Sequence, residues 1–165
     1  MVRSLKEKLN VGEYQPFLPV KEMPRRNRGV IRKERKLLFP GYVFIQTEIE
    51  TGLIAEKLKS ALTDVTEKWY EGIYSILHYG DNKKDVAVRE KERLYWECLF
   101  DVDFCIKGSV GVIEGDTIRV TSGPLAGMES RIKRINRHKR EAVVEMDVMG
   151  AVREVKLMLE VVAKV

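Results

Sequence analysis

The chain has 165 residues, of which 44% are hydrophobic and 33% are charged, and its 30 Lys and Arg against 25 Asp and Glu leave a net charge of +5. This composition indicates one or two folded domains with an apolar core and excludes a disordered chain. No apolar run approaches the roughly 20 residues of a membrane helix, and no apolar leader opens the chain. We therefore expect a cytoplasmic protein with no membrane partner.

The residue types that carry catalysis are sparse and scattered. Cys98 and Cys105 stand seven positions apart, which fits neither a zinc site nor a disulfide framework, so we expect buried or unreactive thiols. His78 and His138 are isolated from each other and from other catalytic residue types, which does not favour acid-base catalysis. Phosphate loops and nucleophile elbows are absent from the sequence. The prediction is a protein that is not an enzyme and has no cofactor and no metal.

The first 36 residues predict a helix, an extended segment and a basic loop. Residues 1–10 have apolar side chains every three or four positions, which favours a short helix. Pro16 and Pro19 make residues 14–22 extended. Residues 24–36 hold seven basic side chains and one acidic one, and predict a solvated hairpin loop. Such a loop either merely stays in water or contacts nucleic acid, and its candidate ligands are Arg25, Arg26, Arg28 and Arg32.

Residues 37–46 read Leu-Leu-Phe-Pro-Gly-Tyr-Val-Phe-Ile-Gln. Pro40 cannot donate to a sheet ladder, and Gly41 can adopt backbone angles that other residues avoid, so this pair predicts a turn into a strand. In such a strand Tyr42, Phe44 and Gln46 face one side. Val43 and Ile45 face the other side. Because both faces are largely apolar, we expect an interior strand in the core.

Helix and strand patterns follow in turn. Residues 51–62 predict a helix with Ile54, Leu58 and Ala61 on one face and Thr51 as its N-cap. Residues 64–72 predict irregular structure, and residues 73–79 alternate like a strand. Residues 88–100 predict a second helix, whose apolar positions are Val88, Leu94, Tyr95, Cys98 and Leu99. The order of elements is most of a split βαβ plan, with helices on one face of an antiparallel sheet, and the fold class is α+β.

The pattern changes near residue 114 to short alternating strands. They are expected at 117–120, 128–135, 141–146 and 152–157, with turn residues between them. A small β-barrel of four or five strands closes most easily over this pattern. The predicted layout is therefore an amino-terminal domain at 1–104, a linker at 105–113 and a β-barrel domain at 114–165.

Two motifs resemble one known family. A basic run followed by Phe39, Pro40, Gly41, Tyr42 and Val43 resembles the signature of the amino-terminal (NGN) domain of the NusG family of transcription elongation factors. Residues 114–120, Glu-Gly-Asp-Thr-Ile-Arg-Val, and 123–127, Gly-Pro-Leu-Ala-Gly, resemble the KOW motif, whose glycines allow sharp turns. Because both motifs occur in the family's order, the chain is identified as a member of this family.

The resemblance implies a fold, a partner and a site. It implies an NGN domain followed by a KOW barrel, in a monomer that binds the clamp region of RNA polymerase. It places Phe39, Pro40, Gly41 and Tyr42 beside the pocket for the polymerase clamp helices. In this family a strand with an aromatic residue precedes the first helix, so we expect the coding sequence upstream of Met1 to continue in frame with such a segment.

Three features resemble the family's specialised antiterminators of the LoaP type. Residues 131–140 hold six basic side chains and no acidic one, residues 64–74 form a longer segment than is typical, and Met149 stands where Phe commonly precedes glycine. We therefore expect the barrel to bind nascent RNA, such as a leader hairpin, through Lys133, Arg134, Arg137, His138, Lys139 and Arg140. Residues 110–165 contain no Phe, Tyr or Trp, so recognition is expected to rest on phosphates and RNA shape rather than on aromatic stacking.

Two alternatives stay open. One is a general NusG-type elongation or termination factor, in which the basic stretch is only a solvated barrel edge. The other is a ribosome-associated KOW protein that binds RNA, and the Phe-Pro-Gly-Tyr motif argues against it.

Overall fold

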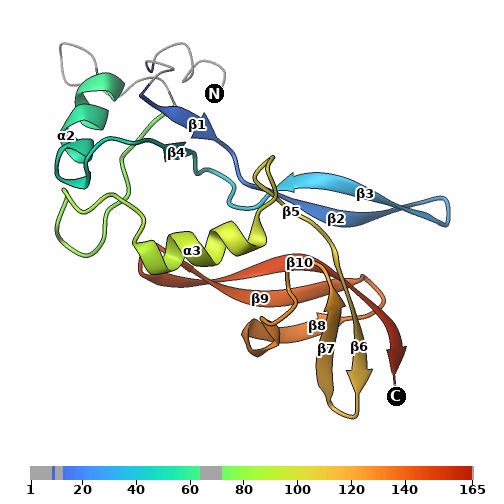
Figure 1. Ribbon diagram of the computed structural model, residues 1–165. Coiled ribbons are helices and arrows are strands. Elements are labelled where there is room, and N and C mark those ends of the chain that lie inside the picture. The colour runs from blue at the N-terminus through green and yellow to red at the C-terminus, as the bar shows by residue number, and fades with distance from the viewer. Residues whose placement is uncertain (1–8, 10–12, 64–71, 165) are drawn as a thin grey trace. The chain divides into compact units, whose positions relative to one another are not determined.

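The computed structural model describes residues 9, 13–63 and 72–164, and the predicted helix at 1–10 and most of the segment 64–72 lie outside them (Figure 1). Two α-helices and ten strands lie within the described residues, a mixture compatible with the predicted α+β class. The chain divides into two compact units, one of Met1–Leu18 with Tyr42–Glu90 and the other of Pro19–Gly41 with Lys91–Val165. The second unit therefore joins an early hairpin to the carboxyl-terminal half, a grouping absent from the sequential layout predicted above. In the described part of the chain, no helix has both the length and the apolar character needed to cross a membrane.

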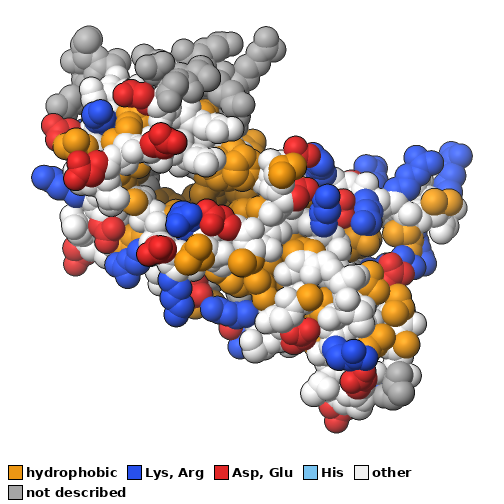
Figure 2. Space-filling view, in the orientation of Figure 1, with side chains coloured by type: hydrophobic (Ala, Val, Ile, Leu, Met, Phe, Trp, Pro, Cys, Tyr) orange, Lys and Arg blue, Asp and Glu red, His pale blue; other side chains and the backbone are white. Residues whose placement is uncertain are grey.

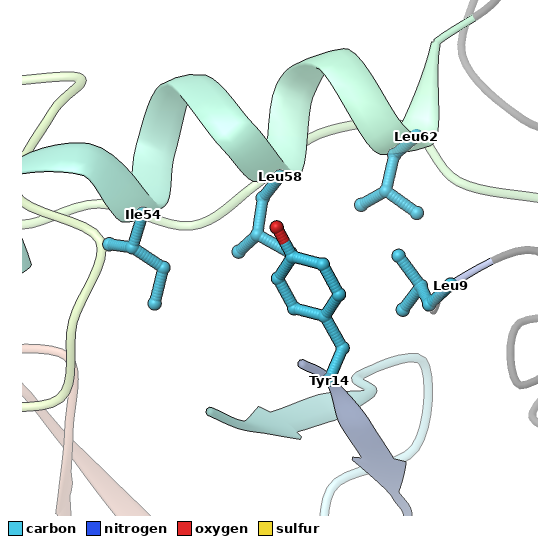
Figure 3. Packing of buried hydrophobic residues seen from close by; sticks show 5 residues of the cluster. All are labelled: Leu9, Tyr14, Ile54, Leu58 and Leu62. Carbon is cyan, nitrogen blue, oxygen red and sulfur yellow. The ribbon is translucent and has the colours of Figure 1, made fainter. Parts of the chain in front are cut away.

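The first unit packs one helix against a short ribbon. β1 (Gln15–Phe17) pairs antiparallel with β4 (Phe44–Gln46). The ring centroids of Phe17 and Phe44 lie 5.8 Å apart. Helix α2 (Thr51–Leu62) has the predicted bounds. Its buried side chains pack with two residues from the start of the chain, in a core that Figure 3 shows: Leu9, Tyr14, Ile54, Leu58 and Leu62.

Three local predictions for the first unit are wrong. The strand after Pro40 belongs to a two-stranded ribbon instead of the interior of a larger sheet, although Val43 and Ile45 do pack against the core as alternation requires. Residues 73–78 form no strand, because Ile73 and Ile76, which reach the core, are three positions apart and do not follow a period of two. The N-cap of α2 is the residue before Thr51, and it makes no side-chain capping bond.

The basic loop predicted at 24–36 is in fact a regular hairpin. β2 (Val20–Asn27) and β3 (Val30–Leu37) are eight residues each, and β5 (Cys105–Ile106) pairs parallel with the start of β2. Positive φ angles at Arg28 and Gly29, 47° and 84°, build the two-residue turn that suits the twist of a hairpin. Figure 1 shows these strands as a long twisted ribbon.

Five strands form the main sheet of the second unit. They are β6 (Ser109–Glu114), β7 (Thr117–Ser122), β8 (Ile132–Asn136), β9 (Glu141–Val148) and β10 (Ala151–Lys164), in the order β7-β6-β10-β9-β8. The 3-10 turn η1 (Glu129–Arg131) leads into β8, and the Glu129 carboxylate accepts a hydrogen bond from the Val120 N–H at 3.0 Å. Residues 105–113, expected as a linker, instead contain β5 and most of β6. Closure of this sheet into a KOW barrel stays a prediction.

Helix α3 (Glu90–Leu99) packs alongside β9 and β10 (Figure 1). Trp96 donates its indole N–H to the Asp147 carbonyl at 3.1 Å, and the Glu92 carboxylate accepts the N–H groups of Met149 and Gly150 at 3.2 and 3.0 Å. The buried face of α3 is formed by Trp96 and Leu99, whereas the predicted core position Leu94 is half exposed. Tertiary packing against β9 decides which face is buried.

The two cysteines differ in their surroundings. Cys98 is exposed on α3, while Cys105 is buried in β5. Burial, assisted by the charge of Asp101, raises the pKa of the Cys105 thiol. The thiolate of Cys105 is therefore disfavoured, which agrees with an unreactive side chain. Cys98 is not buried, so for this residue the expectation of an unreactive thiol stays a prediction.

Two glycines of the KOW-like motif give a matched stability test. A Cβ on Gly123 would lie 2.7 Å from the Ser109 Cα and 2.9 Å from the Gly108 carbonyl oxygen, and its φ is +96°. Gly127 has a φ of +78°, with nothing within 4 Å of a Cβ. We expect Gly127→Ala to lower the free energy of unfolding by about 1 kcal/mol, and Gly123→Ala by more than about 3 kcal/mol because the backbone must move. Urea unfolding measures both, and equal losses would contradict the packing described for Gly123.

Candidate nucleic-acid interface

The Phe-Pro-Gly-Tyr motif divides into a buried and an exposed part. Phe39 is only 8% exposed, and its ring lies 6.1 Å from that of Trp96. The turn that follows uses Gly41 at a φ of +88°, a conformation that favours glycine. Tyr42 is 39% exposed. Phe39 therefore supports the fold, and Tyr42 is the aromatic side chain of the motif that a partner can contact.

The β2–β3 hairpin concentrates positive charge. Residues 20–37 hold eight Lys and Arg and two Glu, a net charge of +6, whereas the whole chain carries +5. Figure 2 shows the Lys and Arg side chains crowding the far end of this hairpin. The rest of the chain is thus close to neutral, and an anionic partner meets its strongest attraction at the hairpin.

Ion pairs offset the charge near the base of the hairpin but not at its tip. Glu34 contacts both Arg25, at 3.2 Å, and Lys36, at 2.7 Å. Within the described residues, no carboxylate forms an ion pair with the three exposed arginines near the turn: Arg26, Arg28 and Arg32. The strand register places Arg25 directly opposite Arg32, and like charges in that position destabilise a pair of strands. A phosphate group between them would relieve that repulsion.

Glu22 fastens the hairpin to the rest of the second unit. Its carboxylate accepts hydrogen bonds from Lys33 Nζ and from the Gly108 N–H, both at 3.0 Å. Burial by itself would raise the pKa of Glu22, but these two hydrogen bonds outweigh it and hold the pKa below its usual value of 4.5. Farther along the base, Arg35 pairs with Asp103 at 3.1 Å. The hairpin is therefore fixed at its base, and its unpaired charges lie beyond these contacts.

Residues 2–94, more than half of the chain, match the family model described as transcription termination factor nusG. The matched segment includes the Phe-Pro-Gly-Tyr motif and the entire β2–β3 hairpin. The chain belongs to the NusG family. The prediction of the family is therefore confirmed, and the match ends inside α3, so the five-stranded sheet lies outside it. No curated protein matches the chain.

NusG-family proteins are transcription factors that typically bind RNA polymerase, and this chain is a transcription factor of that type. Membership of the family agrees with the expectation that the chain is not an enzyme. The predicted polymerase-binding residues Phe39, Pro40, Gly41 and Tyr42 lie within the matched segment. Which of them touch the polymerase stays a proposal.

The second basic stretch of this NusG-family protein, residues 131–140, is largely neutralised. Four of its six basic side chains pair with carboxylates from neighbouring strands: Arg131 with Asp147 at 3.0 Å, Lys133 with Glu145 at 3.0 Å, Arg134 with Glu154 at 3.5 Å and Arg140 with Glu160 at 2.8 Å. The sequence pattern alone pointed to a strongly positive sheet edge. The edge carries less free charge than that, because its acidic partners come from strands β9 and β10.

A register shift between Ile132 and Arg134 also affects this edge. Ile132 pairs with Val144 and Arg134 with Val143, so Lys133 is an extra residue on β8. Both Lys133 and Arg134 are therefore exposed, although strict alternation would send them to opposite faces. The β8–β9 turn holds the remaining candidates, Arg137, His138 and Lys139, all of them exposed.

Sequence reasoning missed several residues that shape these surfaces. Glu92 carries no sequence signal for its role, because its partners at the β9–β10 turn are 57 and 58 positions away. Lys21 was left out of the hairpin's basic set, and its half-buried ammonium has a pKa lowered by burial. Apolar residues in 20–37 do not alternate with charged ones, so local periodicity gave no signal that the stretch is a pair of strands and not a loop.

The lowered pKa of Glu22 predicts a pH dependence of stability. A carboxyl group with a folded-state pKa below its unfolded value stabilises the protein above about pH 4.5, and this contribution is lost as the pH falls through the folded pKa. We expect the thermal unfolding midpoint of Glu22→Gln to fall less than that of the unaltered protein between about pH 5 and pH 3.

Glu48→Gln is the matched control, since Glu48 is exposed and makes no ion pair within the described residues. It should keep the full pH dependence. A pH profile of Glu22→Gln identical to that of the unaltered protein would contradict the anchoring role of Glu22.

Proposed function

We propose that this NusG-family protein is a transcription elongation factor that binds RNA polymerase and acts as a specialised processive antiterminator, similar to proteins of the LoaP type. Its two basic surfaces are the β2–β3 hairpin and the β8–β9 turn, and both are proposed to contact nucleic acid of the transcription complex. The protein works as a cytoplasmic monomer without a cofactor. The observation that carries the proposal is the hairpin's net charge of +6 with three arginines at its tip that no carboxylate of the described residues pairs with.

Phosphate binding by the hairpin follows from its charge and its geometry. Arg25 and Arg32 face each other across the two strands, and Arg26 and Arg28 continue the positive surface to the turn. Arginine presents a planar set of donors that matches phosphate oxygens, and such contacts position a protein on nucleic acid without reading its sequence. The hairpin is therefore proposed as a contact to the sugar-phosphate backbone.

RNA recognition is proposed for the five-stranded sheet. We assign residues 114–165 to a KOW domain that follows the NGN domain. The side chains available to contact RNA are those of the β8–β9 turn. Arg137, His138 and Lys139 are exposed, whereas Lys133, Arg134 and Arg140 are held in ion pairs. A structured RNA can exchange with the weak exposed pairs at small cost, because exposed salt bridges contribute only about 0–1 kcal/mol.

The second candidate function is that of a general NusG-type elongation or termination factor. The four ion pairs along residues 131–140 favour it, because they make the sheet edge less attractive to RNA than its sequence suggests. The two functions differ in their dependence on a specific RNA leader, which a transcription assay measures.

The polymerase contact is proposed to centre on Tyr42. Exposed tyrosines are frequent anchors in protein interfaces, because they bury a large apolar area and offer a hydroxyl group. Phe39 is proposed to hold the motif in place from within the core, through its packing on Trp96. Truncation at Phe39 would remove core packing, worth about 3–5 kcal/mol, and does not isolate binding.

The hairpin proposal predicts a loss of salt-dependent binding in the variant Arg26→Gln, Arg28→Gln, Arg32→Gln. Each lost phosphate contact should reduce the slope of log affinity against log salt by about 0.7–0.9, so the triple variant flattens it by about 2. Fluorescence anisotropy with a short RNA hairpin and with a DNA duplex, between about 50 and 200 mM salt, measures the slope.

The control for net charge is the triple variant Lys57→Gln, Lys59→Gln, Lys83→Gln, which removes three exposed positive charges outside the hairpin. It should leave the slope almost unchanged. Equal slopes for the two triple variants would show that the hairpin makes no local contact.

The polymerase proposal predicts that Tyr42→Ala weakens binding to RNA polymerase by about 10- to 30-fold, the range expected for an interface anchor. Co-purification with polymerase from the producing cell measures this loss. Tyr74→Ala is the control, because Tyr74 is a tyrosine that is 89% exposed and lies outside the motif. In transcription through a terminator, Tyr42→Ala should also lose the read-through that the unaltered protein supports.

The same transcription assay distinguishes the two functions. With the unaltered protein, read-through downstream of the native leader should exceed read-through downstream of a scrambled leader. Read-through that ignores the leader would favour the general factor, and undiminished binding of Tyr42→Ala to polymerase would remove Tyr42 from the interface.

A further inference from the structure

An open pocket of about 360 Å³ lies between the β8–β9 turn and the end of β10. It is lined by Arg137, His138, Arg140, Glu160 and Val161. This volume lies at the low end of the range of about 300–1,000 Å³ for small-ligand sites. Two hydrogen bonds hold the turn, one from the backbone of β10 and one to the side chain of Asn136. The Arg140 carbonyl accepts the Leu159 N–H at 3.0 Å, and Asn136 Oδ1 accepts the Lys139 N–H at 3.0 Å.

The lining combines planar cations, one carboxylate and one apolar wall. Arg140 Nη1 lies 2.8 Å from Glu160 Oε1, which orients both side chains. An ionised carboxylate has about four acceptor positions, so this contact leaves most of the acceptor capacity of Glu160 available. The guanidinium of Arg137 and the ring of His138 offer flat surfaces, and Val161 provides the apolar side.

Two simple ligands use this set of groups incompletely. A free phosphate would meet the negative charge of Glu160, and a divalent cation would meet two guanidinium groups. A planar ring with N–H donors at one edge fits both features, because arginine and histidine stack on such rings and the carboxylate accepts from the donors. Nucleobases are rings of this kind.

We propose that this pocket binds one unpaired guanine of an RNA loop, with Glu160 reading its Watson–Crick edge; this rests on the proposed RNA binding by the β8–β9 turn. Guanine presents two neighbouring N–H donors, N1–H and N2–H, that match the two oxygens of a carboxylate. Cytosine and adenine place an acceptor beside their amino group, and uracil places acceptors on both sides of its single N–H, so each would set an acceptor against Glu160. Glu160 is thereby the specificity-determining residue of the turn.

RNA loops are the natural source of such a base. Sequence-specific recognition of RNA targets unpaired bases in loops and bulges, where the Watson–Crick edge is free. The sequence alone predicts no stacking, because it offers no Phe, Tyr or Trp here. The structure places Arg137 and His138 in the pocket lining, and the proposal assigns the stacking to their planar side chains.

The test compares RNA hairpins that share one stem and differ at a single loop position. The loop is all uridine, or carries one guanosine, or carries one inosine, which lacks the N2 amino group. With the full chain, we expect the guanosine loop to bind about tenfold more tightly than the uridine loop, with inosine in between, since one hydrogen bond to a charged group is worth about that factor.

The Glu160→Gln variant should reduce the preference for guanosine to less than about threefold, while its affinity for the uridine loop stays equal or rises because a negative charge is removed. Glu154→Gln is the matched control. It removes the same charge from β10, breaks the ion pair with Arg134, and lies outside the pocket lining. It should keep the full guanosine preference. Glu160→Asp, which keeps the charge but withdraws the carboxylate, should also lose the preference.

The outcomes separate this proposal from the one on which it rests. If no hairpin binds in a salt-dependent way, RNA binding itself fails, and the pocket proposal falls with it. If all loops bind equally, or if Glu160→Gln and Glu160→Asp both keep the preference, RNA binding stands and the guanine pocket is overturned. An equal guanine preference and affinity for the same hairpin made of DNA would overturn the assignment to RNA.

Discussion

The indole of Trp96 is the contact on which the second unit depends. It lies 6.1 Å from the ring of Phe39 and donates a hydrogen bond to the Asp147 carbonyl, so one side chain joins three segments that are far apart in the sequence. Glu92, one turn earlier on α3, accepts the two N–H groups of the β9–β10 turn. The buried ring of Trp96 and the two hydrogen bonds to Glu92 are both costly to remove. Together they hold α3 against the β9–β10 hairpin.

This packing has a consequence for the family motif. Phe39 is committed to the core by its place beside Trp96, whereas Tyr42, three residues later, stays exposed. The Pro-Gly turn between them changes the direction of the chain. Phe39 can therefore pack in the core while Tyr42 stays available to a partner. A motif that reads as one aromatic surface in the sequence is divided by a single turn.

The distribution of carboxylates decides which basic surface keeps its charge. Acidic side chains of β9 and β10 form four ion pairs with basic side chains of η1, β8 and the β8–β9 turn. On the β2–β3 hairpin only Glu22 and Glu34 are available, and both act near its base or middle. The hairpin therefore keeps its excess charge, and the sheet gains ordered, partly neutral surfaces such as the pocket beside Glu160.

The sequence by itself determined the family, the helix at 51–62, the alternation around Val43 and Ile45, and the strands at 117–120, 141–146 and 152–157. These features depend on neighbours within one or two turns, and local periodicity reports such neighbours directly. Only the tertiary structure decided which charged residues form ion pairs and which residues of the Phe-Pro-Gly-Tyr motif are buried. The carboxylates that neutralise Arg134 and Arg140 stand 20 positions further along the chain, and Trp96 meets Phe39 across 57 positions. Pairing and burial at those separations depend on the register of β9 with β10 and on the docking of α3, which no local pattern encodes.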